Sequence, residues 1–187
     1  MMGRHRLRRA LGASLVEMVA GLLILSFVTA SVVSMYTTGR QSHRRARFYS
    51  KSQTEIRYAL REMTRRIRTS NALLAQGTQG NLSGIASSSF QVVMTVPSGG
   101  GTKQCRYYVS NGILYRQTST QSAPGTPILK DVVQLTFAYY KTAAGTRISA
   151  TGAVGSATEV EILLQARYES VTTGLAAYVT LRSVVAG

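Results

Sequence analysis

Cysteine, aspartate and histidine are scarce in this chain. Cys105 is the only cysteine among 187 residues, so no intrachain disulfide can form, and its stretch of alternating apolar and polar residues predicts a buried thiol. Asp131 is the only aspartate, and no cluster of His, Cys and Asp has metal-ligand spacing. We therefore expect no catalytic triad, no metal centre and no cofactor, and we interpret the chain as a protein that is not an enzyme.

Charge of either sign is missing from Met18 through Gly39. This run is about as long as a helix must be to cross a hydrocarbon core of about 30 Å, so it is a transmembrane candidate. Glu17 stands directly before it. A charged side chain at the centre of a membrane helix costs roughly 2.5–3.5 kcal/mol and usually has a partner, so Glu17 is expected to require a cation.

A short basic leader precedes the apolar run and offers a source for that cation. It contains Arg4, Arg6, Arg8 and Arg9, followed by the small residues Gly12 and Ala13. Cleavage after Gly12 would give Ala13 an amino group four residues, about one helical turn, before Glu17. That amine, from the same subunit or a neighbouring one, would neutralise the carboxylate.

The leader, the Gly12–Ala13 junction and Glu17 at the fifth position after it resemble the class III signal of type IV pilins and type II secretion pseudopilins. An ordinary secretory signal loses its apolar region on cleavage, whereas this one would keep it. The resemblance implies cleavage by a prepilin peptidase after Gly12, methylation of Ala13 and an assembly salt bridge made by Glu17. The alternative is a plain signal anchor with an incidental acid.

The formal net charge of +15 is concentrated outside the C-terminal part of the chain. Between Arg40 and Arg68 ten Lys and Arg residues face two acids, whereas eight face four in all that follows. This balance fits anionic lipid, an acidic partner or nucleic acid, and charge alone does not choose among them. Arginines flank the apolar run on both sides, so the usual positive-residue rule does not orient it.

Beyond Gly39 the helical pattern becomes amphipathic. The stripe that should pack on a sheet recurs at spacings of three and four, and consists of Tyr49, Ser52, Ile56, Leu60, Met63 and Ile67. Glu62 is placed to pair with Arg65 or Arg66. A second line, interpreted as a solvated face, consists of Arg57, Arg61, Arg65 and Arg68.

The two patterns together predict one helix from about Ala13 to Ser70, on the order of 85 Å long at 1.5 Å per residue. No proline interrupts this range. Gly39 is the expected place of any bend.

Strand-like alternation begins near residue 90. Asn111-Gly112 between residues 103–110 and 113–118 predicts a two-residue hairpin turn. Three more strands are expected at residues 90–96, on a face shared by Val133, Leu135, Phe137 and Tyr139, and on the series from Val160 to Tyr168. A last strand is expected at about residues 176–185, and loops at residues 76–89, 119–127 and 145–157.

These elements predict an α+β fold, in which a long N-terminal α-helix with a membrane-spanning half and an amphipathic half packs on an antiparallel β-sheet head. The expected divisions are a leader (1–12), a transmembrane and assembly half of the helix (13–39), a basic amphipathic half (40–70) and a β-rich head (71–187).

The order of these features resembles that of PilW-type minor pilins and J-type minor pseudopilins. The resemblance implies a minor subunit that helps to initiate or cap a type IV pilus or a type II secretion pseudopilus. Its partners would be other minor subunits, the major pilin, the prepilin peptidase and inner-membrane lipid. The chain would cross the inner membrane once with its C-terminal head outside the cytoplasm, and would join the pilus or pseudopilus on assembly.

The basic residues after the apolar run leave a second function open. Those expected to contact lipid phosphates just outside the membrane are Arg40, Arg44, Arg45, Arg47 and Lys51. The alternative is that they contact the phosphates of DNA, as in a minor pilin of a competence pilus. A signal-anchored enzyme is a third class, for which the sequence offers no catalytic group.

Overall fold

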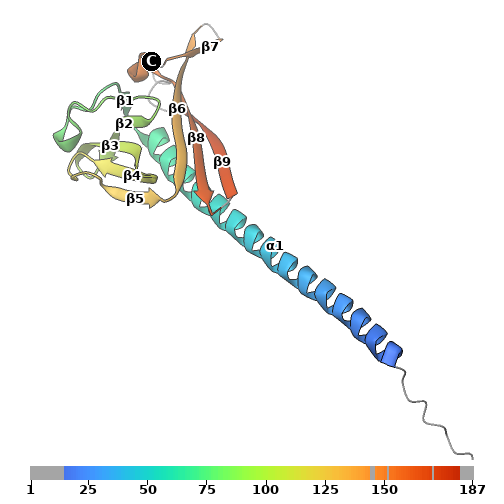
Figure 1. The fold of residues 1–187 in the computed structure, drawn as a ribbon. Coiled ribbons are helices and arrows are strands. Elements are labelled where there is room, and N and C mark those ends of the chain that lie inside the picture. Colours follow the sequence, from blue (N-terminus) through green and yellow to red (C-terminus); the bar gives the residue numbers. More distant parts are fainter. Residues whose placement is uncertain (1–14, 144–145, 151, 170, 182–187) are drawn as a thin grey trace, which may run out of the picture. The chain divides into compact units, whose positions relative to one another are not determined.

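A computed structural model describes residues 15–143, 146–150, 152–169 and 171–181 (Figure 1). The chain divides into two compact units, Met1–Arg45 and Ala46–Gly187, and the helix α1 (Leu15–Thr69) contributes to both. α1 remains helical through Gly39, which confirms the long predicted helix over the described residues. The predicted leader, with Gly12 and Ala13, lies outside the described residues.

The second unit combines the end of α1 with two antiparallel sheets, so the α+β prediction is confirmed. The first sheet has the order β1 (Ala72–Leu74), β2 (Gln91–Ser98), β3 (Gly101–Ser110), β4 (Ile113–Thr118), β5 (Thr126–Leu129). The second has the order β7 (Thr146–Ser149), β6 (Val132–Ala143), β8 (Glu159–Tyr168), β9 (Val171–Thr180). Two short 3₁₀ helices, η1 (Gly80–Leu82) and η2 (Val154–Ser156), lie in the connections.

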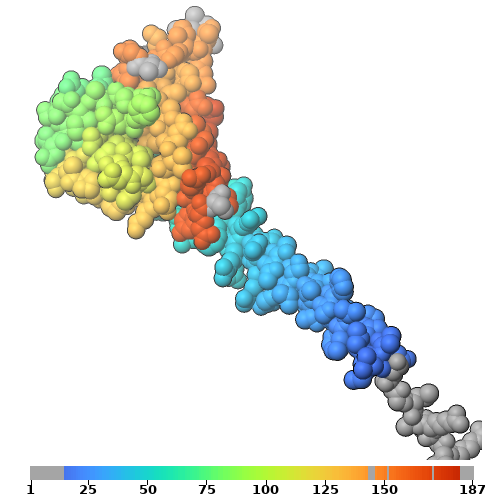
Figure 2. Space-filling view, viewed as in Figure 1, coloured from blue at the N-terminus to red at the C-terminus, as the bar shows by residue number. Residues whose placement is uncertain are grey.

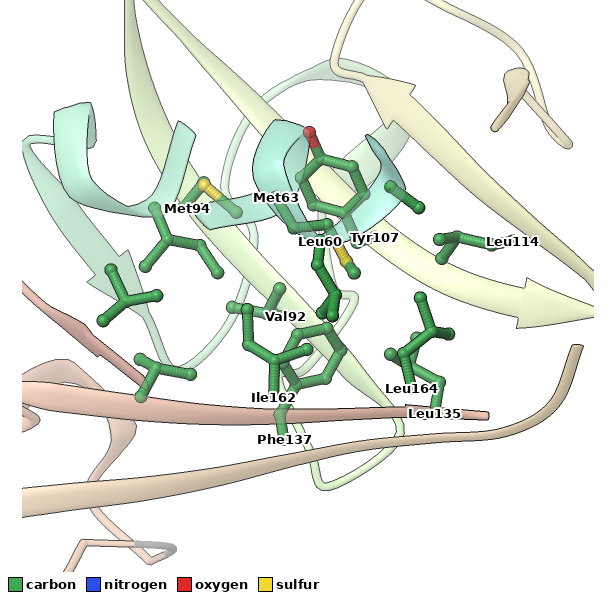
Figure 3. Close-up of a cluster of buried hydrophobic side chains, with 14 of the residues drawn as sticks. Leu60, Met63, Val92, Met94, Tyr107, Leu114, Leu135, Phe137, Ile162 and Leu164 are labelled. Atoms are coloured by element: carbon green, nitrogen blue, oxygen red, sulfur yellow. The ribbon is translucent and has the colours of Figure 1, made fainter. Parts of the chain in front are cut away.

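The core of this unit forms where α1 meets both sheets. Figure 3 shows Leu60 and Met63 of α1 near Val92 and Tyr107 of the first sheet, with Phe137 among the labelled residues of the second. The predicted apolar stripe is confirmed from Ser52 onward, because its buried members are Ser52, Ile56, Leu60, Met63 and Ile67. Tyr49 was expected on the same face but is exposed.

The predicted hairpin is confirmed. Ser110 of β3 pairs with Ile113 of β4, which leaves Asn111 and Gly112 as the two turn residues. Their φ angles are 50° and 70°, the left-handed values that a type I′ turn requires and that Asn and Gly adopt at least cost.

The face predicted for β6 is wrong at its first residue. Leu135, Phe137 and Tyr139 are buried, but Val133 is 58% exposed and Val132 is buried in its place. The register between β6 and β8 shifts between Val132 and Gln134. A bulge inserts one extra residue and changes the face on which the preceding side chains lie.

Three other expectations about the head need correction. Two regions expected to be loops contain the first two residues of β5 and all of β7, both short strands at the edge of a sheet. The last strand begins at Val171, five residues earlier than expected. Pro97, which follows the strand expected at residues 90–96, lies exposed within β2.

Candidate functional site: an apolar helix half and its basic flank

The first half of α1 exposes apolar side chains on every side. None of its most apolar stretch is buried. The large apolar side chains left exposed are Leu15, Val16, Met18, Val19, Leu22, Leu23, Ile24, Leu25, Phe27, Val28, Val32, Val33, Met35 and Tyr36. Leu22 to Leu25 are consecutive and successive residues point about 100° apart, so the helix has no polar face there. A helix that is apolar all round belongs in a protein core or in a membrane.

The exposed apolar surface of this segment is large enough to favour an apolar environment over water. Full burial of one large apolar side chain gains roughly 1.5–3 kcal/mol relative to water, so fourteen of them represent tens of kcal/mol. Among the described helices, α1 alone is long and apolar enough to span a membrane. This is compatible with a single-pass membrane anchor.

Four hydroxyl groups of this segment donate hydrogen bonds within the helix. Ser26 donates to the Leu23 carbonyl over 2.8 Å, Thr29 to that of Leu25 over 2.7 Å, and Ser31 to that of Phe27 over 2.8 Å. Thr37 donates to the Ser34 carbonyl over 2.9 Å. Each of these four hydroxyl protons therefore has an acceptor without water, which is the condition for placing it in hydrocarbon.

Glu17 lies in the first turn of α1. The unpaired N–H groups of a first turn carry partial positive charge, so this is a favourable place for a carboxylate. Its predicted partner, the amine of a cleaved Ala13, falls outside the described residues, and so does Gly12. The structure therefore places Glu17 but does not test the predicted cleavage after Gly12 or the predicted salt bridge with the Ala13 amine.

The basic flank begins in the first unit with Arg40, whose guanidinium lies 4.9 Å from the centre of the Tyr36 ring. Arg44 and Arg45 are exposed. An arginine over a tyrosine ring at the end of an apolar segment is an arrangement suited to a lipid interface, where both side chains have one apolar and one polar part.

In the second unit, Arg47 is exposed but Lys51 is engaged with the head. The Lys51 ammonium lies 3.9 Å from the Glu55 carboxylate and 5.2 Å from the centre of the Tyr168 ring. Phe48 stacks on that same ring, with centroids 5.8 Å apart. Tyr168 ends β8, so these contacts dock the end of that strand on α1. Of the five predicted phosphate-contacting residues, Lys51 is therefore the one that also has a structural role.

Glu62 forms salt bridges with three arginines in the second unit. Its carboxylate accepts hydrogen bonds from Arg66 at 2.6 Å, Arg116 at 2.8 Å and Arg65 at 3.0 Å, and its side chain is only 13% exposed. Burial opposes its ionisation, but the hydrogen bonds from these arginines outweigh burial and lower the pKa of Glu62. The same pairing raises the pKa of Arg66 against the opposing effect of burial.

Sequence reasoning found only part of this cluster. Helical spacing predicted the pairs with Arg65 or Arg66, and both are present. It missed Arg116, which comes from β4, 54 residues away in the chain. No local pattern signals a contact at that separation. Through the Arg116 contact, the Glu62 carboxylate links α1 to the first sheet.

No known protein family model matches this chain, and no curated protein is significantly similar to it. Within the described residues, no group of three or more His, Cys, Asp or Glu side chains could hold a metal ion.

Proposed function

We propose that this chain is a minor pilin or pseudopilin, a structural subunit that helps to initiate or cap a type IV pilus or type II secretion pseudopilus. Residues 18–39 would anchor it in the inner membrane, with the head outside the cytoplasm. The observation that carries the proposal is the change of character within α1: its first half is apolar on all sides, whereas its second half buries one stripe in the core of an α+β head.

On assembly, the first half of α1 would replace its contacts with lipid by contacts with the helices of other subunits. Tight helix packing in an apolar medium needs small residues. A Cβ added at Gly21 would meet no atom within 4 Å outside the adjacent helix backbone, and Ala20 and Ser26 lie near it in sequence. These residues would let a neighbouring helix approach closely. The exposed Arg44 and Arg45 would meet lipid phosphates before assembly.

The Glu17 carboxylate would supply the specific contact during assembly. A prepilin peptidase would cut after Gly12, and the new Ala13 amine would pair with Glu17 of the same or a neighbouring subunit. In a low-dielectric medium an unpaired carboxylate is costly, so the pair would favour a subunit seated in register over one that is not.

Substitution of Glu17 tests this function in the native host. Glu17→Ala should leave the protein in the membrane but remove it from sheared filaments or from crosslinks to other subunits. Glu55→Ala is the matched control, since Glu55 is a helical acid in a surface pair with Lys51, and it should incorporate normally. Normal incorporation of Glu17→Ala would contradict the proposal.

A DNA-binding minor pilin of a competence pilus is the second candidate, and the exposure of Arg44, Arg45 and Arg47 favours it. DNA affinity of the detergent-solubilised chain should then fall with salt, and Arg44→Gln/Arg45→Gln should reduce the salt slope by about two, since each phosphate contact contributes about 0.9. Lys130→Gln/Lys141→Gln, with the same loss of charge, should not. Binding no stronger than that of a scrambled basic helix would exclude this candidate.

A further inference from the structure

A groove of about 600 Å³ lies between the second half of α1 and the strand β9. The helix lines it from Arg57 to Thr69, and the strand contributes Leu175, Ala176 and Ala177. In Figure 2 the red surface of β9 borders the cyan surface of this part of α1. Both walls belong to the second unit, so the groove is a feature of the head.

The helical wall of the groove is strongly basic. Its four arginines, all exposed, are Arg57, Arg61, Arg65 and Arg68. Arg65 pairs with Glu62, and among the described residues no carboxylate forms a salt bridge with the other three. Like charges three or four residues apart destabilise a helix by about 0.2–0.5 kcal/mol per pair. Repulsion among these four arginines therefore destabilises the helix in the isolated chain, and an acidic partner would relieve that repulsion.

The other wall is the edge of β9. Among the described strands, β9 is the last of its sheet and pairs with β8 on one side only. Alternate peptide groups of such a strand point away from its neighbour and can pair with an added strand. Leu175 and Ala177 are partly buried and pack against the core, so this part of β9 is held in place by core contacts. The groove therefore offers backbone hydrogen bonds on one side and positive charge on the other.

The spacing of the charges matches an extended peptide. Arginines four residues apart on a helix are about 6 Å apart along its axis, and side chains on one face of a strand recur every 6.6–6.8 Å or so. From Arg57 to Arg68 the helix advances about 16 Å, the length of roughly five strand residues. Acids at alternate positions of a strand would thus face successive arginines.

We propose that this groove binds an extended segment of a partner protein that carries acidic side chains at alternate positions, which adds a strand to the edge of β9 and places its carboxylates on the arginine line. Strand addition derives affinity from backbone hydrogen bonds and specificity from alternate side chains. This proposal concerns the head alone and does not depend on the membrane function. A nucleic acid would satisfy the arginines but has no peptide groups to pair with the edge of β9, so the peptide is favoured.

Fluorescence anisotropy with the full chain in neutral-lipid nanodiscs tests the proposal. The probe is a labelled seven-residue peptide in which glutamate alternates with threonine and valine. Its affinity should fall at least tenfold for Arg61→Glu/Arg68→Glu and change less than twofold for Lys130→Glu/Lys141→Glu, which carries the same charge change at exposed positions away from the groove. Circular dichroism of each variant verifies the fold.

Two further probes separate strand addition from charge attraction. The same peptide with alternate backbone nitrogens methylated keeps its charges but loses donors, and should bind at least tenfold more weakly. An oligothymidylate of equal charge should bind more weakly than the unmethylated peptide. Equal losses in both double variants, no effect of backbone methylation, or tighter binding of the oligothymidylate would each overturn the proposal.

Discussion

Glu62 joins three arginines from two elements, and its carboxylate is largely buried. Arg116 reaches it from β4, while Arg65 and Arg66 reach it from α1 itself. The cost of burying one carboxylate is offset only while these hydrogen bonds are made. Its loss would leave the half-buried guanidinium groups of Arg66 and Arg116 without their counter-ion.

We predict that Glu62→Gln lowers the free energy of unfolding of the head by about 1–3 kcal/mol, the penalty for leaving a buried polar group poorly satisfied. Glu55→Gln removes an acid from the same helix whose pair with Lys51 is exposed and 3.9 Å long, so it should change that free energy by less than about 1 kcal/mol. Urea denaturation of both variants measures the difference. Equal effects would show that the Glu62 cluster contributes no more than a surface pair.

The same carboxylate predicts a pH dependence. The pKa of Glu62 in the folded head lies below its ordinary value of 4.5, so its contribution is fully present above about pH 4.5 and is lost as pH falls through the folded pKa. The difference in unfolding free energy between the wild type and Glu62→Gln should therefore be constant from about pH 7 to 5 and shrink below pH 4.5. A difference that grows with acidity would contradict the assigned direction.

Cys105 is fully buried in the core cluster, and burial raises the pKa of its thiol to about 11. A thiol that is both inaccessible and protonated is unreactive. At pH 8 iodoacetamide should therefore label the folded chain at least a hundredfold more slowly than the chain in urea, as followed by intact mass. Rapid labelling under native conditions would mean that the first sheet opens readily around Cys105.

At the scale of elements, the β3–β4 hairpin depends on two residues in left-handed backbone conformations. Gly112→Ala should lower the free energy of unfolding by about 1–2 kcal/mol, because φ near 70° strains a residue with a Cβ. Gly99→Ala is the control: it also lies in a hairpin connection, but its φ is not in that region and nothing lies within 4 Å of an added Cβ. Thermal unfolding of both variants distinguishes conformational strain from the mere loss of a glycine.

The elements that sequence predicted well are those set by local pattern. Helical spacing identified the buried stripe of α1, and Asn111-Gly112 identified the hairpin. Strict alternation identified the buried face of β8, where Val160, Ile162, Leu164 and Ala166 are buried. For the helix and the strand, the period of the apolar side chains predicts which face is buried.

Two of the missed features, β5 and β7, are too short to show an alternating pattern, and the third, the bulge in β6, depends on a contact distant in sequence. β5 and β7 are short edge strands held by single neighbours, and their composition is that of loops. The bulge at Val133 follows from the register against β8, which alternation within β6 does not reveal. Of the candidate site, pattern alone located the apolar run, Glu17 and the basic flank, but neither the Arg116 contact nor the groove beside β9.

At the scale of the whole molecule, a single 55-residue helix supplies two different kinds of surface. Its second half is completed by the two sheets of the head, which bury the stripe from Ser52 to Ile67. Its first half is completed by nothing within the described chain. Its apolar surface would be covered by lipid and then by neighbouring helices, and the exposed arginines that follow it would contact lipid phosphates.

In the proposed function, proteolysis after Gly12 creates the amine that pairs with Glu17 in an apolar helix. Intact-mass measurement of the native protein, purified from the membranes of its host, shows whether this cleavage occurs. We predict a mature chain that begins at Ala13, with or without one added methyl group on its amine. A functional chain that still begins at Met1 or Met2 and carries the arginine-rich leader would contradict it.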